Sequence, residues 1–126
     1  MAYFGNTVDF ATPGTVEVDE VERVLMRAAS YIRKDGHAKR ALYNDGAYCV
    51  RGALNRACGA DREDPMWDTV PWNNRPVHSE AMGRLRKTIR TENEVVWNNA
   101  PERTAEEVID ALESAARARA LVAEGK

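Results

Sequence analysis

Apolar residues repeat at helical spacing in several separate segments of this 126-residue sequence. In the first segment, Val21, Val24, Leu25, Ala28 and Ile32 recur three or four residues apart, which places them on one face of an α-helix. Such a face has to be covered by another element, so the pattern requires several helices that pack around a common core. The sequence therefore predicts a mainly helical fold.

Capping residues mark the ends of the first and last helices. Asp19 and the acids after it suit the start of the first helix, and Lys34-Asp35-Gly36 suits its end. The segment Thr104-Ala105-Glu106-Glu107 is a capping box for the last helix. Its apolar positions are Val108, Ile109, Leu112, Ala115, Ala116, Ala118 and Val122.

The region between these helices predicts a hairpin and then a short helix. Asp45-Gly46 separates two short apolar and aromatic pieces within residues 41–49, which is typical of a hairpin turn. From Val50 the helical spacing returns until Gly59. We expect Gly52, one turn into this helix, to let another stretch of backbone approach closely.

Three further elements are expected before the last helix. Residues 61–76 contain three prolines and are predicted to form a loop that Met66, Trp67 and Trp72 hold against the body of the protein. Ser79 is the predicted cap of a helix that reaches Arg90. Glu94-Val95-Val96-Trp97 has the composition of a strand.

These elements predict one compact domain of the α or α+β class. It has about four helices, near residues 20–35, 50–58, 80–90 and 104–122, and a small β-hairpin. The length suits a single domain, with residues 1–18 as an N-terminal arm or loop and residues 19–126 as the helical domain.

Composition excludes several classes of protein. Hydrophobic residues make up 44% and charged residues 30%, which is typical of a folded globular chain. No stretch approaches the roughly 18 apolar residues of a membrane span, and the N-terminal residues lack the features of a signal peptide. Cys49 and Cys58 are too few for a disulfide framework. We expect a cytoplasmic protein with free thiols and no membrane association.

Charge is distributed unevenly along the chain. Residues 23–90 carry 14 Lys and Arg against 7 Asp and Glu, whereas both flanking segments are acidic. A basic middle could bind nucleic acid or an acidic protein surface. The alternative is an ordinary solvated surface with many salt bridges.

Cys49 is the first candidate site residue because a thiol at a helix N-terminus can have a lowered pKa. A catalytic thiol also needs a positioned base, and the only histidines, His37 and His78, lie in segments predicted to be loops. The alternative is that Cys49 is a small buried side chain between the hairpin and the next helix. No adjacent-ligand spacing joins these cysteines and histidines, so no metal site is predicted.

The pattern Trp-Asn-Asn-x-Pro occurs twice, at residues 72–76 and 97–101. Such loops could present amides and an aromatic face to a ligand, with Trp97, Asn98, Asn99 and Arg103 as the binding residues. Arg103 would then contact an anion at the N-terminus of the last helix. The alternative is that each Trp anchors a loop and each Asn pair bonds the backbone. No catalytic or cofactor-binding motif accompanies these residues, so no cofactor is predicted.

Several local sequences together resemble a family of small uncharacterised proteins of actinobacteria and their bacteriophages. They are residues 25–29, the Cys-x-x-Gly-Ala-Leu segment at 49–54, Val96-Trp97-Asn98-Asn99, and Arg103-Thr104 before an Ala-rich helix. The resemblance covers about residues 21–118, and at His37 this chain departs from the Trp that the family tends to have there. It implies a phage or prophage gene and supplies no chemistry.

We therefore expect a non-enzymatic interaction protein that binds a host or phage macromolecule in the bacterial cytoplasm. The partner is expected to be a protein, with nucleic acid as the second candidate through residues 23–90. The alternative is a small ligand-binding protein or a Cys-dependent enzyme that uses Cys49 and the Trp97–Arg103 region.

Overall fold

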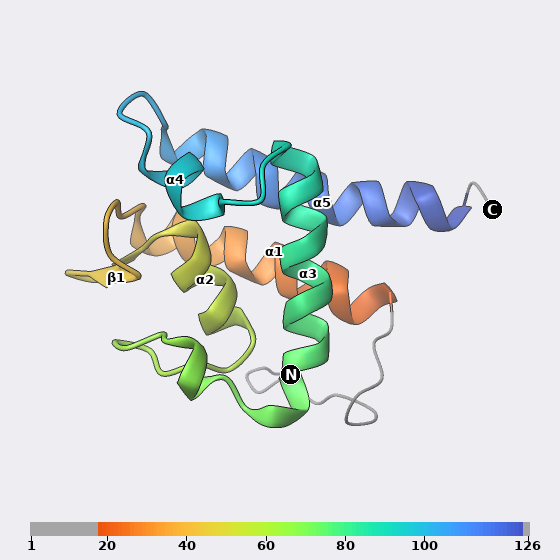
Figure 1. Cartoon of the computed structure of the whole chain (residues 1–126), viewed down its shortest axis with the longest axis horizontal. Helices are drawn as coiled ribbons and strands as arrows, with labels where there is room; N and C mark the ends of the chain where they lie inside the picture. Colours follow the sequence, from red (N-terminus) through yellow and green to blue (C-terminus); the bar gives the residue numbers. More distant parts are fainter. Residues whose placement is uncertain (1–17, 125–126) are drawn as a thin grey trace.

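The computed structural model describes the backbone of residues 18–124 and the side chains of residues 20–118. This part of the chain forms five α-helices and one two-stranded antiparallel hairpin, so the predicted mainly helical fold is confirmed (Figure 1). The elements are α1 (Val18–Asp35), β1 (Tyr43–Asn44), β2 (Ala47–Tyr48), α2 (Val50–Ala57), the 3-10 turns η1 (Trp67–Thr69) and η2 (Trp72–Asn74), α3 (Arg75–Ile89), α4 (Glu94–Asn99) and α5 (Ala105–Glu124). The arm predicted before α1 and the side chains of Asp19 and Val122 lie outside the described residues.

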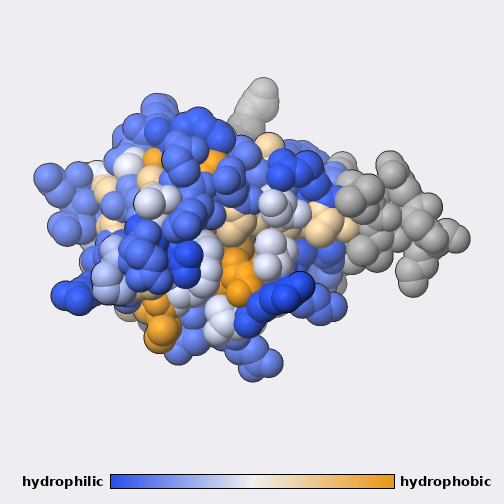
Figure 2. Space-filling model, turned by 90° about the horizontal axis from the view of Figure 1, so that it is seen from above, coloured by the Kyte–Doolittle hydropathy of each residue, from blue (hydrophilic) through white to orange (hydrophobic). Residues whose placement is uncertain are grey.

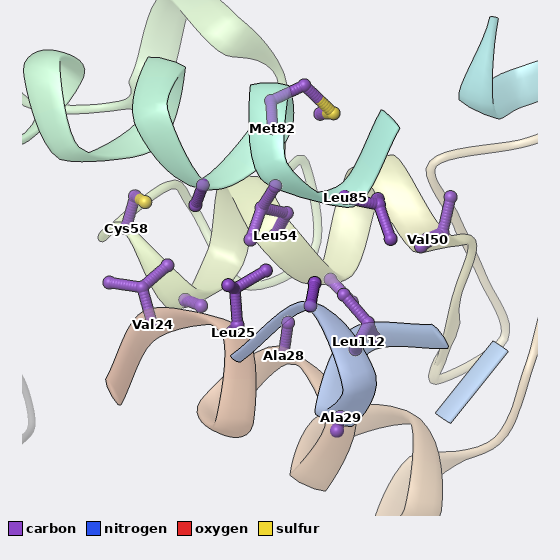
Figure 3. Packing of buried hydrophobic residues seen from close by; sticks show 14 of the residues in the cluster. Val24, Leu25, Ala28, Ala29, Val50, Leu54, Cys58, Met82, Leu85 and Leu112 are labelled. Carbon is purple, nitrogen blue, oxygen red and sulfur yellow. The ribbon is translucent and has the colours of Figure 1, made fainter. Parts of the chain in front are cut away.

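The two longest helices form the base of the domain. α1 and α5 lie along each other, α3 crosses both, and α2 packs against α1 (Figure 1). Leu25, Leu54, Leu85 and Leu112 meet in the core and are fully buried, one from each of these four helices (Figure 3). Each buried leucine contributes about 1.5–3 kcal/mol of burial free energy. Small residues such as Ala28 and Ala115 complete the core and allow the helix axes to approach closely.

The predicted caps are present at the end of α1 and the start of α5. Gly36 follows α1 with a φ of +103°, which favours glycine. At α5 the Thr104 Oγ1 accepts from the Glu107 N–H at 3.1 Å, and Glu107 Oε1 accepts from the Thr104 N–H at 3.0 Å. This reciprocal pair is the predicted capping box.

The hairpin also forms where the sequence places it. Tyr43 pairs with Tyr48 across the two strands, and the turn residues Asp45 and Gly46 have φ values of +53° and +92°. Positive φ at both turn residues is the type I′ geometry that Asp-Gly favours.

Two of the expected element assignments are wrong. Residues 94–97 belong to helix α4 and not to a strand, because Asn93 caps the helix by accepting from the Val96 N–H at 3.1 Å, and Glu94 is drawn into the interior by two arginines. Helix α3 begins at Arg75 and not after Ser79, since η2 leads directly into it and Pro76 suits the first helical turn.

Candidate functional site

Cys49 is the N-cap residue of α2, as its position in the sequence suggested. Its side chain is only 4% exposed, and its Sγ accepts a hydrogen bond from the Gly52 N–H at 3.3 Å. Burial raises the pKa of the Cys49 thiol, and it raises the pKa of the fully buried Cys58 thiol as well. This environment favours the packing interpretation of Cys49 over an activated thiol.

Both histidines bond to asparagine side chains. The Nε2 of His37 lies 2.8 Å from Asn98 Oδ1, and the Nε2 of His78 lies 2.6 Å from Asn55 Oδ1. Among the described residues, the Cys49 Sγ has no hydrogen bond to either histidine. Among the side chains that the structure describes, no group of three His, Cys, Asp or Glu residues is arranged to hold a metal ion.

Asn98 joins three segments that are far apart in the sequence. Its Oδ1 accepts from the Val50 N–H at 2.9 Å, and its Nδ2 donates to the Ala38 carbonyl at 3.0 Å and to Asn99 Oδ1 at 3.1 Å. The side chain is fully buried. These contacts, together with the one to His37, use the hydrogen-bonding capacity of the Asn98 amide. Asn98 thus ties α4 to the start of α2 and to the segment after α1.

Asn99 and Arg103 are also held by internal contacts. Asn99 Oδ1 accepts from the Arg40 N–H at 2.8 Å. The Arg103 guanidinium lies 4.2 Å from the centre of the Trp97 ring, donates to the Trp97 carbonyl at 2.9 Å and pairs with Glu107 at 3.3 Å. The four ligand-binding candidates of this segment therefore lie together. Asn98 and Asn99 attach α4 to residues 37–50, and Arg103 holds the loop between α4 and α5.

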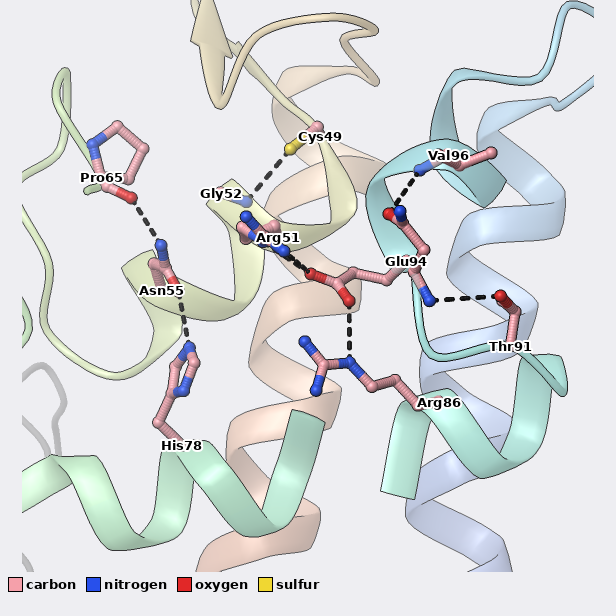
Figure 4. Close-up of polar contacts among 11 residues, drawn as sticks. Cys49, Arg51, Gly52, Asn55, Pro65, His78, Arg86, Thr91, Glu94 and Val96 are labelled. Carbon is pink, nitrogen blue, oxygen red and sulfur yellow. Dashed lines mark hydrogen bonds and ion pairs between the residues drawn. The ribbon is translucent and has the colours of Figure 1, made fainter. Parts of the chain in front are cut away.

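Glu94 is the centre of a second polar cluster. Its carboxylate is fully buried, accepts from Arg51 Nε at 2.6 Å and from Arg86 Nε at 2.8 Å, and so connects α4 to α2 and α3 (Figure 4). Burial alone would raise the pKa of Glu94, but the hydrogen bonds from Arg86 and Arg51 outweigh it and lower the pKa. The cluster uses two of the basic residues that the sequence offered as nucleic-acid contacts.

The expectation that Met66, Trp67 and Trp72 hold the 61–76 loop against the core is wrong for Met66 and Trp72 and holds in part for Trp67, whose ring contacts His78 of α3. These side chains are 45%, 41% and 79% exposed. The buried attachments of the loop are made by smaller groups: Val70 is buried, Asn74 Nδ2 donates to the Cys58 carbonyl at 2.7 Å, and Asn55 Nδ2 donates to the Pro65 carbonyl at 2.8 Å. These attachments leave the large side chains at the surface.

Arg75 and His78 order the exposed tryptophans. The Arg75 guanidinium lies 4.7 Å from the centre of the Trp67 ring and 4.5 Å from that of Trp72, so it contacts both rings. The Trp67 ring also packs against the His78 ring at 4.8 Å. We call Met66, Trp67, Trp72 and Arg75 the tryptophan surface. In the sequence this surface was indicated by two tryptophans within a proline-rich loop. The same pattern is also typical of tryptophans that anchor a loop in the core.

Large apolar side chains are scarce elsewhere on the surface of the described residues. Figure 2 shows one face on which hydrophilic side chains predominate and apolar ones form small areas. Of the large hydrophobic side chains described, only Met26, at 43%, and Val96, at 64%, are strongly exposed outside the tryptophan surface. None of the described helices has the length and apolar character needed to cross a membrane.

Comparison with known proteins gives one match. The model of a family of unknown function, DUF6197, matches residues 16–118, which include α1, α2, α3, the first 14 residues of α5, Cys49, Asn98 and the tryptophan surface. No curated protein and no solved structure matches the chain.

Proposed function

This chain belongs to DUF6197, a family of unknown function, and we propose that it is a non-enzymatic binding protein whose partner docks on the tryptophan surface. The observation that carries the proposal is the exposure of Trp72 and Trp67, at 79% and 41%, on a loop fixed by buried hydrogen bonds. Tryptophan and arginine are the residue types most enriched among interface residues that dominate binding energy.

The loop is ordered before any partner arrives, which favours binding. Arg75 donates to the Val70 carbonyl at 3.1 Å while it lies against both indole rings, so the loop and the first turn of α3 support each other. A partner that contacts the tryptophan surface therefore has little side-chain and loop entropy to remove.

Internal ion pairs support a protein partner in preference to nucleic acid. Within the basic segment 23–90, Arg51 and Arg86 are paired with Glu94, Arg84 with Glu80, and Arg33 with Glu113. Nucleic-acid binding depends on many cations that are free to contact phosphates. The finer expectations from the sequence, a phage or prophage gene and a host or phage partner in the bacterial cytoplasm, belong to the same proposal.

Capture from a lysate of an actinobacterial host tests the proposal with the substitution Trp72→Ala. We expect proteins recovered with the wild-type chain to fall at least tenfold with Trp72→Ala, since loss of a dominant interface side chain costs about 2 kcal/mol or more. Val96→Ala is the matched control, because Val96 is 64% exposed and lies on α4, away from the 61–76 loop (Figure 1).

The measurement is quantitative mass spectrometry of proteins captured in parallel by the three chains, with nuclease-treated lysate in a second series. Thermal unfolding should show that Trp72→Ala folds as the wild type does, because the side chain is largely exposed. Equal capture by the wild type and Trp72→Ala, or capture that nuclease abolishes, would contradict the proposal.

A further inference from the structure

The outward side of α3 carries a groove between Ser79 and Glu92. A depression of about 490 Å³ is lined by Gly83, Arg86, Lys87, Arg90, Thr91 and Glu92. A second one of about 250 Å³ is lined by Ser79, Glu80, Gly83, Arg84 and Lys87. The two share Gly83 and Lys87, so they form one groove along the helix.

Gly83 is the lowest point of this groove because it has no side chain. It lies in the middle of a 15-residue helix, is exposed, and an added Cβ would have no atom within 4 Å. Glycine in a helix interior costs about 1 kcal/mol relative to alanine. No packing within the described part of the chain requires glycine here, whereas close approach of another molecule to the α3 backbone would require it.

The side of α3 on which the groove lies also carries Arg75, which contacts both tryptophans. Arg75, Ser79 and Gly83 are four residues apart and therefore follow one side of α3. From Arg75 to Arg90 this side is about 22 Å long at 1.5 Å per residue. A segment lying along it would contact Trp72 at one end and the last turn of α3 at the other.

Free positive charge lies at the far end of the groove. Arg84 pairs with Glu80 at 2.9 Å and Arg86 with Glu94 at 2.8 Å, so the charges of these two arginines are already compensated. Lys87 and Arg90, in contrast, have no side-chain partner among the residues described in the structure. Glu92 lines the same depression and offsets one of these two charges, so the far end of the groove stays net positive. A net positive charge of this size suits a carboxylate and is small for a nucleic-acid backbone.

We propose that this groove binds an acidic polypeptide segment, with its backbone over Gly83 and its carboxylates at Lys87 and Arg90. The inference rests on the proposed function, since the segment belongs to the partner that contacts the tryptophan surface. The inference adds the chemical class of the partner's segment and its direction, which runs along α3 from Trp72 to Arg90.

The test uses a 16-residue peptide of equal numbers of Glu and Ala as the probe. Titration into ¹⁵N-labelled full-length protein, followed by NMR, is expected to shift the amide signals of Gly83, Lys87 and Arg90. A Lys and Ala peptide of the same length and a 12-nucleotide single-stranded DNA are the comparison ligands. Binding of the DNA at Gly83 in preference to the acidic peptide would overturn the proposal, as would the absence of any shift with the acidic peptide.

Gly83→Ala separates binding from folding. The variant should unfold at a higher denaturant concentration than the wild type, because alanine fits the helix without a clash. Its affinity for the acidic peptide should nevertheless fall at least fivefold. Lys87→Gln/Arg90→Gln should cause a similar loss, whereas the charge-matched control Lys34→Gln/Arg40→Gln should not. Unchanged affinity in Gly83→Ala would overturn the inference.

Failure of this inference can be distinguished from failure of the proposed function. If Trp72→Ala abolishes capture of a protein that Gly83→Ala and Lys87→Gln/Arg90→Gln still capture fully, the tryptophan surface is the docking site and the groove is not. If the acidic peptide binds at Gly83 but Trp72→Ala captures as the wild type does, the assignment of the partner to the tryptophan surface is wrong, and the inference that rests on it is wrong as well.

Discussion

His78 is a single buried side chain that orders the loop bearing the tryptophans. The Nδ2 of Asn55 donates to the Pro65 carbonyl, so the Oδ1 of Asn55 must face His78 and accept from its Nε2–H (Figure 4). The His78 imidazole also contacts the Trp67 ring, so it connects Asn55 of α2 to the tryptophan that the loop carries. The arrangement uses the neutral imidazole with its proton on Nε2.

Acidification is expected to destabilise the protein through His78. Burial, with a smaller contribution from the Arg86 charge, lowers the pKa of His78 from 6.5 to about 4 in the folded state. Between these values the unfolded chain binds a proton that the folded chain does not, so the contribution is complete above pH 6.5 and is lost as the pH falls towards 4. The loss is on the order of 3 kcal/mol, from 1.36 kcal/mol per pKa unit.

Urea unfolding at pH 7 and at pH 4.5 measures this effect in the wild type and in His78→Gln. The glutamine amide can still donate to Asn55 but does not titrate, so the variant should lose less stability on acidification. Parallel losses in both proteins would show that other groups cause the pH dependence.

At the scale of elements, local signals identified those helices and turns whose causes lie within a few residues. The box at Thr104, the Asp45-Gly46 turn and the close approach at Gly52 were all predicted, and all are observed. Residues 94–97 were misassigned because Val-Val-Trp favours a strand, whereas the helix there depends on Glu94 meeting Arg51 and Arg86 from other helices. A single sequence does not contain that spatial information.

The same limit explains the candidate site. The sequence singled out Asn98 and Cys49 by type and spacing, but it could not show that Asn98 bonds to Val50, Ala38 and His37. It also could not distinguish tryptophans that anchor a loop from tryptophans that a loop displays, because the loop is held by two buried asparagines, Asn55 and Asn74, whose partners the sequence does not show.

Gly52 is the point at which the hairpin and α2 depend on each other. An added Cβ would overlap the carbonyl O of Leu42, which also accepts the Cys49 N–H at 3.2 Å. We expect Gly52→Ala to cost at least about 3 kcal/mol, because backbone on both sides has to move. Gly83→Ala, the same change at an open helical position, should be stabilising. Chemical denaturation of the two variants makes the comparison, and equal stability would show that α2 and the 37–48 segment are not closely coupled.

At the scale of the whole molecule, the four leucines from α1, α2, α3 and α5 belong to one continuous core. The two thiols lie at opposite ends of α2, with Cys58 in this core and Cys49 buried at the other end. If this core unfolds as one unit, neither cysteine becomes accessible without global unfolding.

Thiol labelling in native buffer tests this cooperativity. Single-cysteine variants, Cys58→Ala and Cys49→Ala, should react with a disulfide reagent at least roughly a thousandfold more slowly than in denaturant, because a typical domain is stable by about 5 kcal/mol or more. After correction for each variant's own stability, the two protection factors should agree, since both thiols are buried and burial raises both pKa values. Fast labelling of Cys49 alone, with a thiol pKa below its usual value, would instead indicate a locally open, activated thiol. That result would favour the Cys-dependent enzyme over the binding protein. A catalytic thiol has to be accessible, whereas a thiol that packs in the interior at the start of α2 is not.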